Sequence, residues 1–458
     1  MFSKILVANR GEVAVRIIRA CKEMGIHTVA VYSEADKEAL HTDLADESYC
    51  IGGPLVKDSY LNIDAILTIA LHCGVEAIHP GYGLLSENAE FARKCIENDI
   101  VFIGPSPEVI DKMGDKDEAR RTMKNAGVPI IEGSDIVETA EEGVAIANKV
   151  GYPILIKARS GGGGRGIRPV YAESEFESNF ISAKEEAKSA FGDGALYIEK
   201  YLTNVKHVEV QVLADKQGKV VVLGDRDCSA QRKNQKLIEE CPAPTLPEDI
   251  RVRMHEAARK ATGAVGYVTV GTIEFLLDSS NEFYFMEMNT RLQVEHSVTE
   301  MACGVDIVKW QIRTAAGLKI PFDEKDIHID GHAIECRICA EDPKTFTPCC
   351  GEIKILHVPG GPNVRFDSAI YQNYVIPPYY DSMLGKIIVY SKTREEAIRK
   401  MRSALSELVI HGIVHNSDMH LELISDERFE SGTYTTDFLK DRWCRWILRI
   451  YLKMYITN

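Results

Sequence analysis

The first segment of the chain alternates between strand and helix patterns. Residues 4–10, "KILVANR", form an apolar strand run, and residues 12–25, "EVAVRIIRACKEMG", repeat apolar positions at helical spacing before a glycine. Residues 27–33, "HTVAVYS", are a second strand run. Because two strands joined through a helix lie parallel, this pattern predicts a parallel sheet. Two further strand runs, each followed by a Gly/Pro-rich loop ("AIHPGYGLLSEN" and "IVFIGPS"), extend it into an open α/β domain with ligand-binding loops at the strand ends.

The middle of the chain predicts a small α+β unit. Strand runs at 152–158 and 195–202 flank a glycine-rich segment and a polar helix at 173–191. A unit of this kind is suited to be a lid over a nucleotide. Residues 204–300 are rich in strand patterns, and after residue 330 two more strand runs precede a helix at 394–409.

Length and charge narrow the possible functions. A chain of 458 residues is too long for one hydrophobic core, so two to four domains are expected. The net charge of −14 disfavours binding to nucleic acid or to an anionic membrane. The N-terminus lacks the apolar core of a signal peptide, and no apolar run reaches the ~18 residues that span a bilayer, so we expect no transmembrane segment. The 12 cysteines have no repeated spacing, which favours reduced thiols in a cytosol.

The segment at 160–166, "SGGGGRG", has a backbone that an anion can approach closely, because successive glycines carry no side chains. It does not match the GxxxxGK[ST] pattern of a P-loop, and it does not open a Rossmann unit. Its own residues leave two interpretations, a phosphate-binding loop and a flexible surface loop.

The segment "GTIEFLLDSSNEFYFMEMNTR", from Gly271 to Arg291, carries the strongest chemical signal. Two strands joined at the turn 278–281 direct alternate side chains to one face, which would hold Val270, Thr272, Glu274 and Leu276 on the first strand and Phe283, Phe285, Glu287 and Asn289 on the second.

Glu274 and Glu287 are nearly equidistant from that turn, so we expect them to lie opposite each other. Two carboxylates in apolar surroundings raise each other's pKa, and a divalent cation that bridges nucleotide phosphates removes the repulsion. Asn289 would add a neutral oxygen. Because Tyr284, Met286 and Met288 make the other face apolar as well, the strand is expected to be buried on both sides; the alternative is a solvent-facing strand with incidental acids.

A set of motifs then occurs in one order from residue 1 to about residue 440. They are "ILVANRGEVAVRIIRA", "HPGYGLLSEN", "MGDK", "GGGGRGIR", "YIEKYL", "HVEVQVLAD", "RDCSAQRKNQKLIEE", "MEMNTRLQVEH", "ECRICAEDP" and "PPYYDSMLGK". In these motifs the chain resembles the biotin carboxylases, the ATP-grasp subunits of biotin-dependent carboxylases.

The resemblance implies a multidomain α/β and α+β protein with an ATP-grasp fold. It implies an N-terminal open parallel α/β domain at 1–114, an ATP-grasp domain at 115–330 with its lid at about 131–203, a C-terminal mixed α+β domain at 331–445 and a tail at 446–458.

For ATP, the resemblance implies that the glycine run is the lid loop that closes over the triphosphate, with Gly163 and Gly164 nearest the phosphates. The other residues implied at the nucleotide are Lys116 and Lys157 at the phosphates, Glu199, Lys200, Tyr201 and Leu202 in a hinge whose backbone reads adenine, and His207, Gln231, Asn234, Glu274, Leu276 and Glu287. The implied ligands of Mg²⁺ or Mn²⁺ are Glu274, Glu287 and Asn289.

The second implied substrate is bicarbonate. In "NTRLQVEH" the residues Arg291, Gln293 and Glu295 stand at alternate positions, so an extended chain would point all three the same way. Arg291 would bind the anion and Glu295 would remove its proton. Lys236 and the backbone N–H of Val294 match the remaining bicarbonate contacts. The alternative is a structural ion pair between Arg291 and Glu295.

The implied reaction starts when Glu295 deprotonates bicarbonate, whose oxygen attacks the γ-phosphorus of ATP. Carboxyphosphate forms and releases CO₂ beside biotin. Arg337 of "ECRI" is implied to stabilise the enolate oxygen of biotin, and Tyr82 and Gly83 of "HPGYG" are implied to lie near it. The implied catalytic residues are Arg291, Glu295, Lys236 and Arg337.

We therefore expect an ATP-dependent ligase that carboxylates biotin on a separate biotin carboxyl carrier protein, as the first half-reaction of acetyl-CoA carboxylase in fatty acid synthesis. Carboxyltransferase subunits, a homodimer and a cytoplasmic location are expected with it. The carrier is expected to be separate because Lys124, in "RTMKNAG", lies in a helix-like stretch and no carrier-sized segment follows the matched motifs. The alternatives are the same half-reaction for pyruvate or another acyl-CoA, another ATP-grasp ligase, and a non-catalytic nucleotide-binding homologue.

Several positions depart from the family pattern. Arg159 and Ser160 replace small residues of the lid loop, which predicts altered loop mobility or ATP affinity. Asn234 replaces a common histidine, which predicts a weaker nucleotide contact. Ser297 replaces a usual proline, which predicts a looser strand around Glu295. None of these changes, nor the pair Cys349–Cys350 in a turn, removes a catalytic group, so an active enzyme is expected.

The C-terminal segment "DRWCRWILRIYLKMYITN" places Arg445, Arg449 and Lys453 four residues apart, on one stripe of a predicted helix. Such a basic amphipathic helix can lie on a membrane or on a partner protein. The alternative is a tail that packs on the body of the protein.

Overall fold

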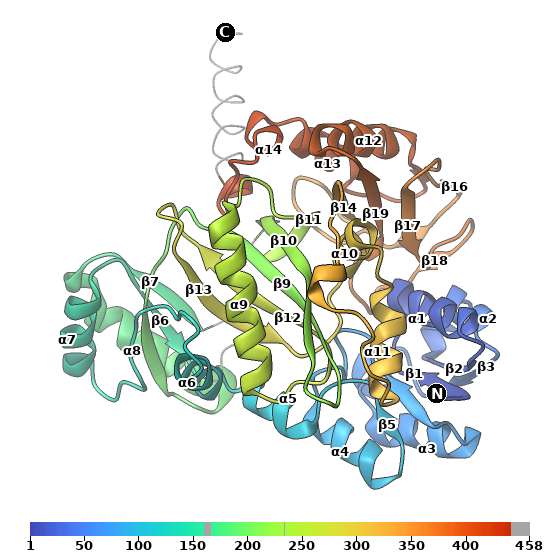
Figure 1. Ribbon diagram of the computed structural model, residues 1–458, viewed down its shortest axis with the longest axis horizontal. Helices are drawn as coiled ribbons and strands as arrows, with labels where there is room; N and C mark the ends of the chain where they lie inside the picture. The colour runs from blue at the N-terminus through green and yellow to red at the C-terminus, as the bar shows by residue number, and fades with distance from the viewer. Residues whose placement is uncertain (160–165, 233, 441–458) are drawn as a thin grey trace.

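The computed structural model describes residues 1–159, 166–232 and 234–440 (Figure 1). The predictions for Ser160, Gly163, Gly164 and the C-terminal basic helix fall outside the described residues. Among the helices that are described, none combines the length and the apolar character needed to cross a membrane.

The N-terminal segment forms the predicted parallel sheet. Its strand order is β3-β2-β1-β4-β5, and every neighbouring pair is parallel. The strands are β1 (Lys4–Val7), β2 (His27–Tyr32), β3 (Glu47–Cys50), β4 (Ala77–His79) and β5 (Val101–Phe102), and the helices are α1 (Gly11–Glu23), α2 (Leu40–Leu44), α3 (Ile63–Cys73), α4 (Ala89–Glu97) and α5 (Pro107–Gly114). The open α/β prediction is confirmed.

The lid segment is a second, smaller unit, drawn in green at the left of Figure 1. Its antiparallel sheet has the order β7-β6-β8 and packs on two helices around a core that includes Ile156, Phe176 and Ile198. After α6 (Lys116–Asn125), its elements are α7 (Ala140–Val150), β6 (Ile154–Ala158), β7 (Ile167–Val170), α8 (Phe176–Phe191) and β8 (Leu196–Lys200).

An eight-stranded antiparallel sheet forms the centre of the molecule, with the order β13-β12-β9-β10-β11-β14-β19-β17. Its strands are β9 (Lys206–Ala214), β10 (Val220–Arg232), β11 (Gln235–Cys241), β12 (Thr269–Leu277), β13 (Phe283–Asn289), β14 (His332–Cys339), β17 (Val364–Ser368) and β19 (Met383–Ser391). Because β11 pairs with β14, one sheet continues across the predicted boundary at residue 330.

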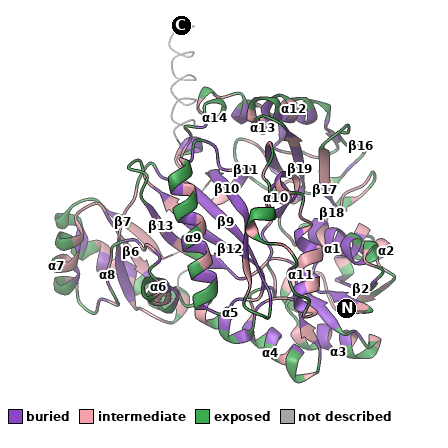
Figure 2. Cartoon of the chain, viewed as in Figure 1, coloured by how far each residue is buried: buried purple, intermediate pink, exposed green. Residues whose placement is uncertain are grey.

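Helices and two small sheets complete the described part. The helices are α9 (Glu248–Ala264), α10 (His296–Cys303), α11 (Ile307–Ala315), α12 (Arg394–Glu407), α13 (Ser417–Ile424) and α14 (Glu427–Glu430). The pairs β15 (Gly351–Glu352) with β18 (Val375–Ile376) and β16 (Ile355–His357) with β20 (Val409–His411) form the small sheets. In Figure 2 the central strands are mainly buried, and the outer faces of α9 and α12 are exposed.

The two faces of β9 differ in chemistry although both are buried. Val208, Val210 and Val212 pack in an apolar core with α9. The residues between them, including Glu209 and Gln211, are polar and are also fully buried. Since side chains alternate along a strand, one face of the sheet packs the core while the other holds buried charges that require partners.

The hairpin of β12 and β13 confirms one prediction and corrects another. Glu274 lies directly opposite Glu287 across the two strands, as expected. A β-bulge follows, because the next pair is Phe275 with Phe285 and Met286 is left over. Phe283, Phe285 and Met288 therefore face the apolar core, while Glu287 and Asn289 lie on the other side. The prediction that the aromatic residues share a face with the acids was wrong, and so was full burial, because Glu287 is exposed.

The apolar side of this hairpin predicts a stability effect. Phe275 is fully buried, and its ring packs edge-to-face on Phe283 with 5.4 Å between centroids. Phe275→Ala should lower the free energy of unfolding by about 3–5 kcal/mol, because it removes apolar contacts and leaves a cavity. Urea unfolding measures this change in the free energy of unfolding, and Val252→Ala, at an exposed position of α9, is the control. Equal unfolding midpoints for the two variants would contradict the prediction.

Candidate active site

Lys236, on β11, lies at the centre of a group of buried carboxylates. Its ammonium donates hydrogen bonds to Glu209 on β9 at 2.6 Å, to Glu274 on β12 at 2.8 Å and to Glu295 at 2.7 Å. Glu295 is the residue that immediately precedes α10. One cation thus joins two strands and a helix start on the polar face of the sheet.

The charges in this group keep Glu295 ionised. Burial disfavours the charge on Lys236, but the carboxylates around it outweigh burial and raise the pKa of its ammonium well above the ordinary value. Burial also opposes ionisation of Glu295, yet Lys236, Arg337 and Arg226 lower the pKa of its carboxyl well below the usual range. Glu295 is therefore a carboxylate, the protonation state that a base requires.

Arg226, a fully buried arginine on β10, supports the group from beneath. Its guanidinium donates to Glu209 at 2.5 Å and to Gln211 at 2.7 Å, and it reaches Thr272 on β12 and Thr299 on α10. Because a guanidinium has five fixed donors, it orients several partners at once. Arg226 thereby holds Glu209, which in turn accepts from Lys236.

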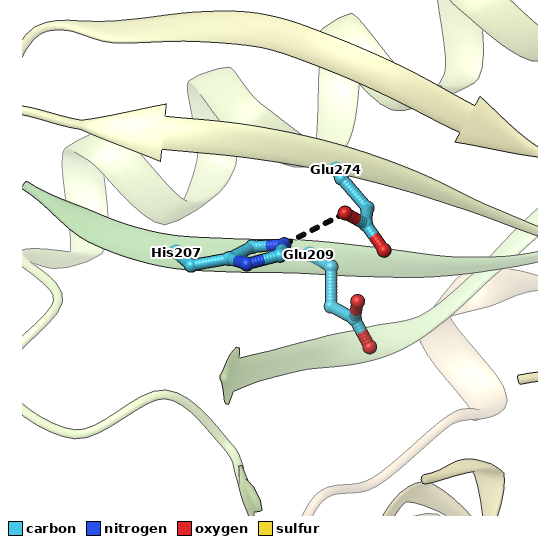
Figure 3. A group of neighbouring side chains, drawn as sticks. All are labelled: His207, Glu209 and Glu274. Carbon is cyan, nitrogen blue, oxygen red and sulfur yellow. Dashed lines mark ion pairs between the residues drawn. The ribbon is translucent and has the colours of Figure 1, made fainter. Parts of the chain in front are cut away.

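The predicted acid pair has unequal electrostatics. Although the Glu287 side chain is exposed, the protein around its carboxyl and the facing carboxylate of Glu274 raise its pKa above the usual value. Burial also opposes ionisation of Glu274, but Lys236 and His207 outweigh it and lower its pKa. The prediction that both pKa values rise was therefore wrong for Glu274. His207 Nε2 lies 2.8 Å from Glu274 Oε2, as Figure 3 shows.

The carboxylates of Glu274 and Glu287 fit a divalent cation, because they lie directly opposite each other on paired strands and offer hard oxygen ligands. Asn289 fits less directly: its amide nitrogen donates to Glu274 at 2.8 Å, and its oxygen accepts from Arg291 at 2.8 Å.

A second group, His207, Glu209 and Glu274, has its ligand atoms within 4.8 Å of one another (Figure 3). The ammonium of Lys236 already compensates both carboxylates of this group. In the acid pair of β12 and β13, Lys236 bonds Glu274 but not Glu287, because its three hydrogen bonds go to Glu209, Glu274 and Glu295.

The predicted bicarbonate residues come together, although not by the expected geometry. Residues 294 and 295 form a turn, so Arg291, Gln293 and Glu295 do not lie on one extended strand. Arg291 donates to Gln293 Oε1 at 2.8 Å, and Gln293 donates to Glu274 at 2.9 Å. The structural ion pair of Arg291 is with Glu87 at 2.8 Å, from the loop after β4, and not with Glu295.

Two lysines approach this region from the other side. Lys116 is the first residue of α6, and burial, followed by repulsion from Lys157, lowers the pKa of its ammonium. Lys157 is the next-to-last residue of β6 and forms an ion pair with Glu199. Because Glu199 already pairs with Lys157, phosphate binding by these two lysines stays a prediction.

The predicted hinge lies at the end of β8. The backbone N–H of Lys200 donates to Glu132 at 2.8 Å, and that of Tyr201 donates to Pro153 at 3.1 Å. Both donors are therefore engaged within the protein, and Glu199 is bound by Lys157. Leu202 follows directly after these residues, outside the strand.

The remaining predicted nucleotide residues lie on the strands of the central sheet and in one of its turns. Leu276 pairs with His207 across β12 and β9, and Gln231 is buried near the end of β10. Asn234 lies in the turn between β10 and β11 with φ of +68°, a conformation that asparagine adopts more readily than most residues. Its side chain is exposed, and Arg159, at the edge of the glycine run, pairs with Asp193 at 2.9 Å.

Of the predicted biotin residues, Arg337 belongs to the group around Glu295, and Tyr82 and Gly83 lie in the loop after β4. Arg337, on β14, donates to Glu239 at 2.6 Å and to Glu295 at 2.9 Å. The hydroxyl of Tyr82 donates to Glu12 on α1. Gly83 is exposed in the same loop with φ of +63°, a left-handed conformation that favours glycine.

Two positions that depart from the family pattern, Ser297 and Cys349, have structural surroundings that the sequence did not predict. Ser297 lies in the first turn of α10, not in a strand, and its hydroxyl donates to Asp367 at 3.1 Å. The expected loosening of a strand was therefore wrong. Cys349 accepts a hydrogen bond from the backbone N–H of Val414 at 3.4 Å, in the turn before β15.

Sequence reasoning missed Glu12, Glu209, Arg226, Glu239 and Lys386. All five are buried charged residues of the sheet or of the helix packed on it. The available signal was a charged side chain inside an apolar strand run, as in "HVEVQVLAD" and "VVVLGDRDCS", since an unpaired charge there is costly.

Three family models match successive parts of the chain. The model of the biotin carboxylase N-terminal domain matches residues 1–110, that of the carbamoyl-phosphate synthase L chain ATP-binding domain matches 115–322, and that of the biotin carboxylase C-terminal domain matches 335–441. Biotin carboxylase 1 of Bacillus subtilis is 55% identical over 96% of this chain and 98% of its own length.

Solved structures agree with these matches. The biotin carboxylase–beta-gamma-ATP complex from Campylobacter jejuni has a TM-score of 0.93 at 50% identity, over 96% of this chain and 99% of that chain. The biotin carboxylase domain dimer of Hydrogenobacter thermophilus 2-oxoglutarate carboxylase, with MgADP, ADP and bicarbonate, has a TM-score of 0.92 at 50% identity, over 96% and 98% of the two chains. The chain therefore has the ATP-grasp fold and belongs to the biotin carboxylase family of ATP-dependent ligases.

Proposed function

We propose that this chain uses ATP and bicarbonate to carboxylate biotin presented by a separate carrier protein. The observation that carries the proposal is the convergence of Lys236 and Arg337 on the buried carboxylate of Glu295. One carboxylate held ionised between two cations, beside an acid pair and two lysines, suits the joining of a small anion to a nucleotide phosphate.

In this proposal Arg291 and Gln293 orient bicarbonate together with Lys236 and the N–H of Val294. Glu295 accepts the bicarbonate proton, and the anion attacks the γ-phosphorus to give carboxyphosphate and ADP. Lys116 and Lys157 compensate the charge of the phosphates, with Gly163 and Gly164 of the lid closing over them.

Adenine and ribose are assigned to the hinge at 199–202 and to His207, Gln231, Asn234 and Leu276. Glu274 and Glu287, with Asn289 once Arg291 releases its oxygen, would hold Mg²⁺ or Mn²⁺, which when bound neutralises phosphate charge.

Carboxyphosphate then yields CO₂ and phosphate beside biotin. Phosphate accepts the ureido N–H proton, and the guanidinium of Arg337 stabilises the enolate oxygen of biotin. Tyr82 and Gly83 would contact biotin from the loop after β4. Arg337 also donates a hydrogen bond to Glu295, so the same residue borders the proposed sites of carboxyphosphate formation and of biotin carboxylation.

The wider assignment is also proposed. We propose acetyl-CoA as the final acceptor of the carboxyl group, which carboxyltransferase subunits would transfer in the cytoplasm. We also propose domains at 1–114, 115–330 and 331–445 and a tail at 446–458. Pyruvate, another acyl-CoA, or 2-oxoglutarate is the alternative, the last because the Hydrogenobacter relative is named for it. That relative was solved as a dimer, which supports a homodimer here. Co-purification that recovers a carboxyltransferase specific for one acceptor decides among them.

A direct test is the release of ADP by the purified chain with ATP and Mg²⁺. Bicarbonate should be required, and biotin should stimulate the rate. ADP release that is independent of bicarbonate would contradict the function, and nucleotide binding without any turnover would favour a non-catalytic homologue.

Glu287→Gln keeps the shape of the side chain but removes one negative charge from the proposed metal site. We predict a loss of kcat for ATP of about 100-fold or more, because the phosphates lose charge compensation. Glu282→Gln is the matched control, since Glu282 is a half-exposed acid at the turn of the same hairpin. Near-normal turnover of Glu287→Gln at saturating Mg²⁺ would remove the metal assignment.

Arg337→Ala should reduce biotin carboxylation more than bicarbonate-dependent ADP release, because the proposed oxyanion role begins after carboxyphosphate has formed. Arg399→Ala on the exposed side of α12 serves as the control. Parallel assays of ADP and carboxybiotin measure the ratio. Equal losses in both assays would count against this division of roles.

The chain should carry no covalent biotin of its own. Lys124 lies within helix α6 and not in a hairpin turn of the kind that presents biotin in carrier domains. We predict no streptavidin signal on the purified chain, and a far lower KM for a biotinylated carrier than for free biotin, since docking supplies orientation. An intact-mass measurement that finds biotin on this chain would overturn the prediction.

A further inference from the structure

Lys386 is a fully buried lysine on β19 that the proposed reaction does not use. Its ammonium donates a hydrogen bond to the backbone carbonyl of Val294. It also lies 3.7 Å from Glu12 Oε1 and 3.9 Å from Glu335 Oε2. Burial disfavours its charge, but Glu12, Glu335 and Asp367 outweigh burial and raise its pKa above the ordinary value. The residue is therefore a buried cation, which is costly unless its partners compensate it.

The first partner, Val294, belongs to the turn that carries the proposed bicarbonate contacts. Along the chain, the carbonyl that Lys386 binds lies between the N–H of Val294 and residue Glu295. Because a peptide unit is planar, fixing this carbonyl fixes the plane that leads into Glu295. The turn lies outside the strands, and Lys386 contacts its backbone carbonyl while Lys236 and Arg337 bind the side chain of Glu295.

The second partner, Glu12, reaches the proposed biotin loop. Glu12 lies on α1, is buried, and accepts the hydroxyl hydrogen of Tyr82 through Oε1. That same oxygen lies 3.7 Å from the ammonium of Lys386. A continuous path therefore runs from the carbonyl of Val294 through Lys386 and Glu12 to Tyr82.

We propose that Lys386 is a positioning residue that couples the bicarbonate turn at Val294–Glu295 to the biotin loop at Tyr82 through Glu12. The proposal rests on the function proposed above and adds that the two substrate sites share one buried support. Loss of the ammonium releases the carbonyl of Val294 and leaves Glu12 without its cation. Both anchors then loosen, whereas the ATP phosphates are held by Lys116 and Lys157 from the lid side.

Steady-state kinetics separate positioning from a general loss of structure. We expect Lys386→Met to raise the KM for bicarbonate by about tenfold or more while the KM for ATP changes less than about twofold, because displacement of a reacting group impairs only the site concerned. Lys386→Arg, which keeps a donor and a positive charge, should recover part of the loss. The control is Lys392→Met, an exposed lysine just beyond the same strand.

A double-mutant cycle tests the coupling to the biotin loop. Tyr82→Phe removes only the hydroxyl that donates to Glu12, and we expect it to raise the KM for biotin about threefold in the wild-type background. In the Lys386→Met background the same change should have little further effect, because Glu12 has already lost its support. Independent, additive effects would overturn the coupling.

The outcomes distinguish this proposal from the function on which it rests. A wild-type chain without bicarbonate-dependent ADP release overturns the function itself. If the wild-type chain is active and Lys386→Met has unchanged KM values and only a lower kcat, the positioning role is overturned and the function is left intact. If Lys386→Met does not fold, Glu12→Gln decides: we expect a higher KM for both bicarbonate and biotin, and unchanged values overturn the proposal.

Discussion

One ammonium group determines the geometry of the site. Lys236 binds Glu209 and Glu274, which lie on two strands, and Glu295, which immediately precedes α10. Three buried carboxylates repel one another strongly, so their approach depends on this cation and on Arg226 beneath it. The start of α10 is consequently fixed against the sheet, and the base proposed for bicarbonate has a defined position and charge. Removal of one partner would leave the others uncompensated.

The same principle extends along the polar face of the sheet. Glu239 on β11 lies directly opposite Glu335 on β14, and Arg337 lies opposite Lys386 on the next strand. Burial raises the pKa of Glu239 to about 7, with Arg337 opposing the rise. Buried charges of both signs therefore form a layer on this face of the sheet, with like charges opposite each other across the strands. We interpret this layer as a support that holds substrate-binding turns which have no regular secondary structure.

Much of the fold follows from local patterns, but the site depends on long-range pairing. The parallel sheet and the facing pair Glu274–Glu287 were predictable from strand period and turn position. The bulge at Met286 was not, because strand period assumes an unbroken ladder. The pairing of Arg291 with Glu87 joins residues 204 positions apart, which no local pattern reports. Lys386 was missed because its partners, Val294 and Glu12, come from two distant segments. The roles of the predicted site residues remain predictions.

The most direct measurement follows the carbon of bicarbonate. The purified chain is incubated with labelled bicarbonate, ATP, Mg²⁺ and a biotinylated carrier protein, and label in acid-labile carboxybiotin is counted. We expect label on the carrier only when ATP is present, in an amount that matches the ADP formed. ADP formation without transfer of label to biotin, under conditions where the carrier is intact, would contradict the assignment of this site to biotin carboxylation.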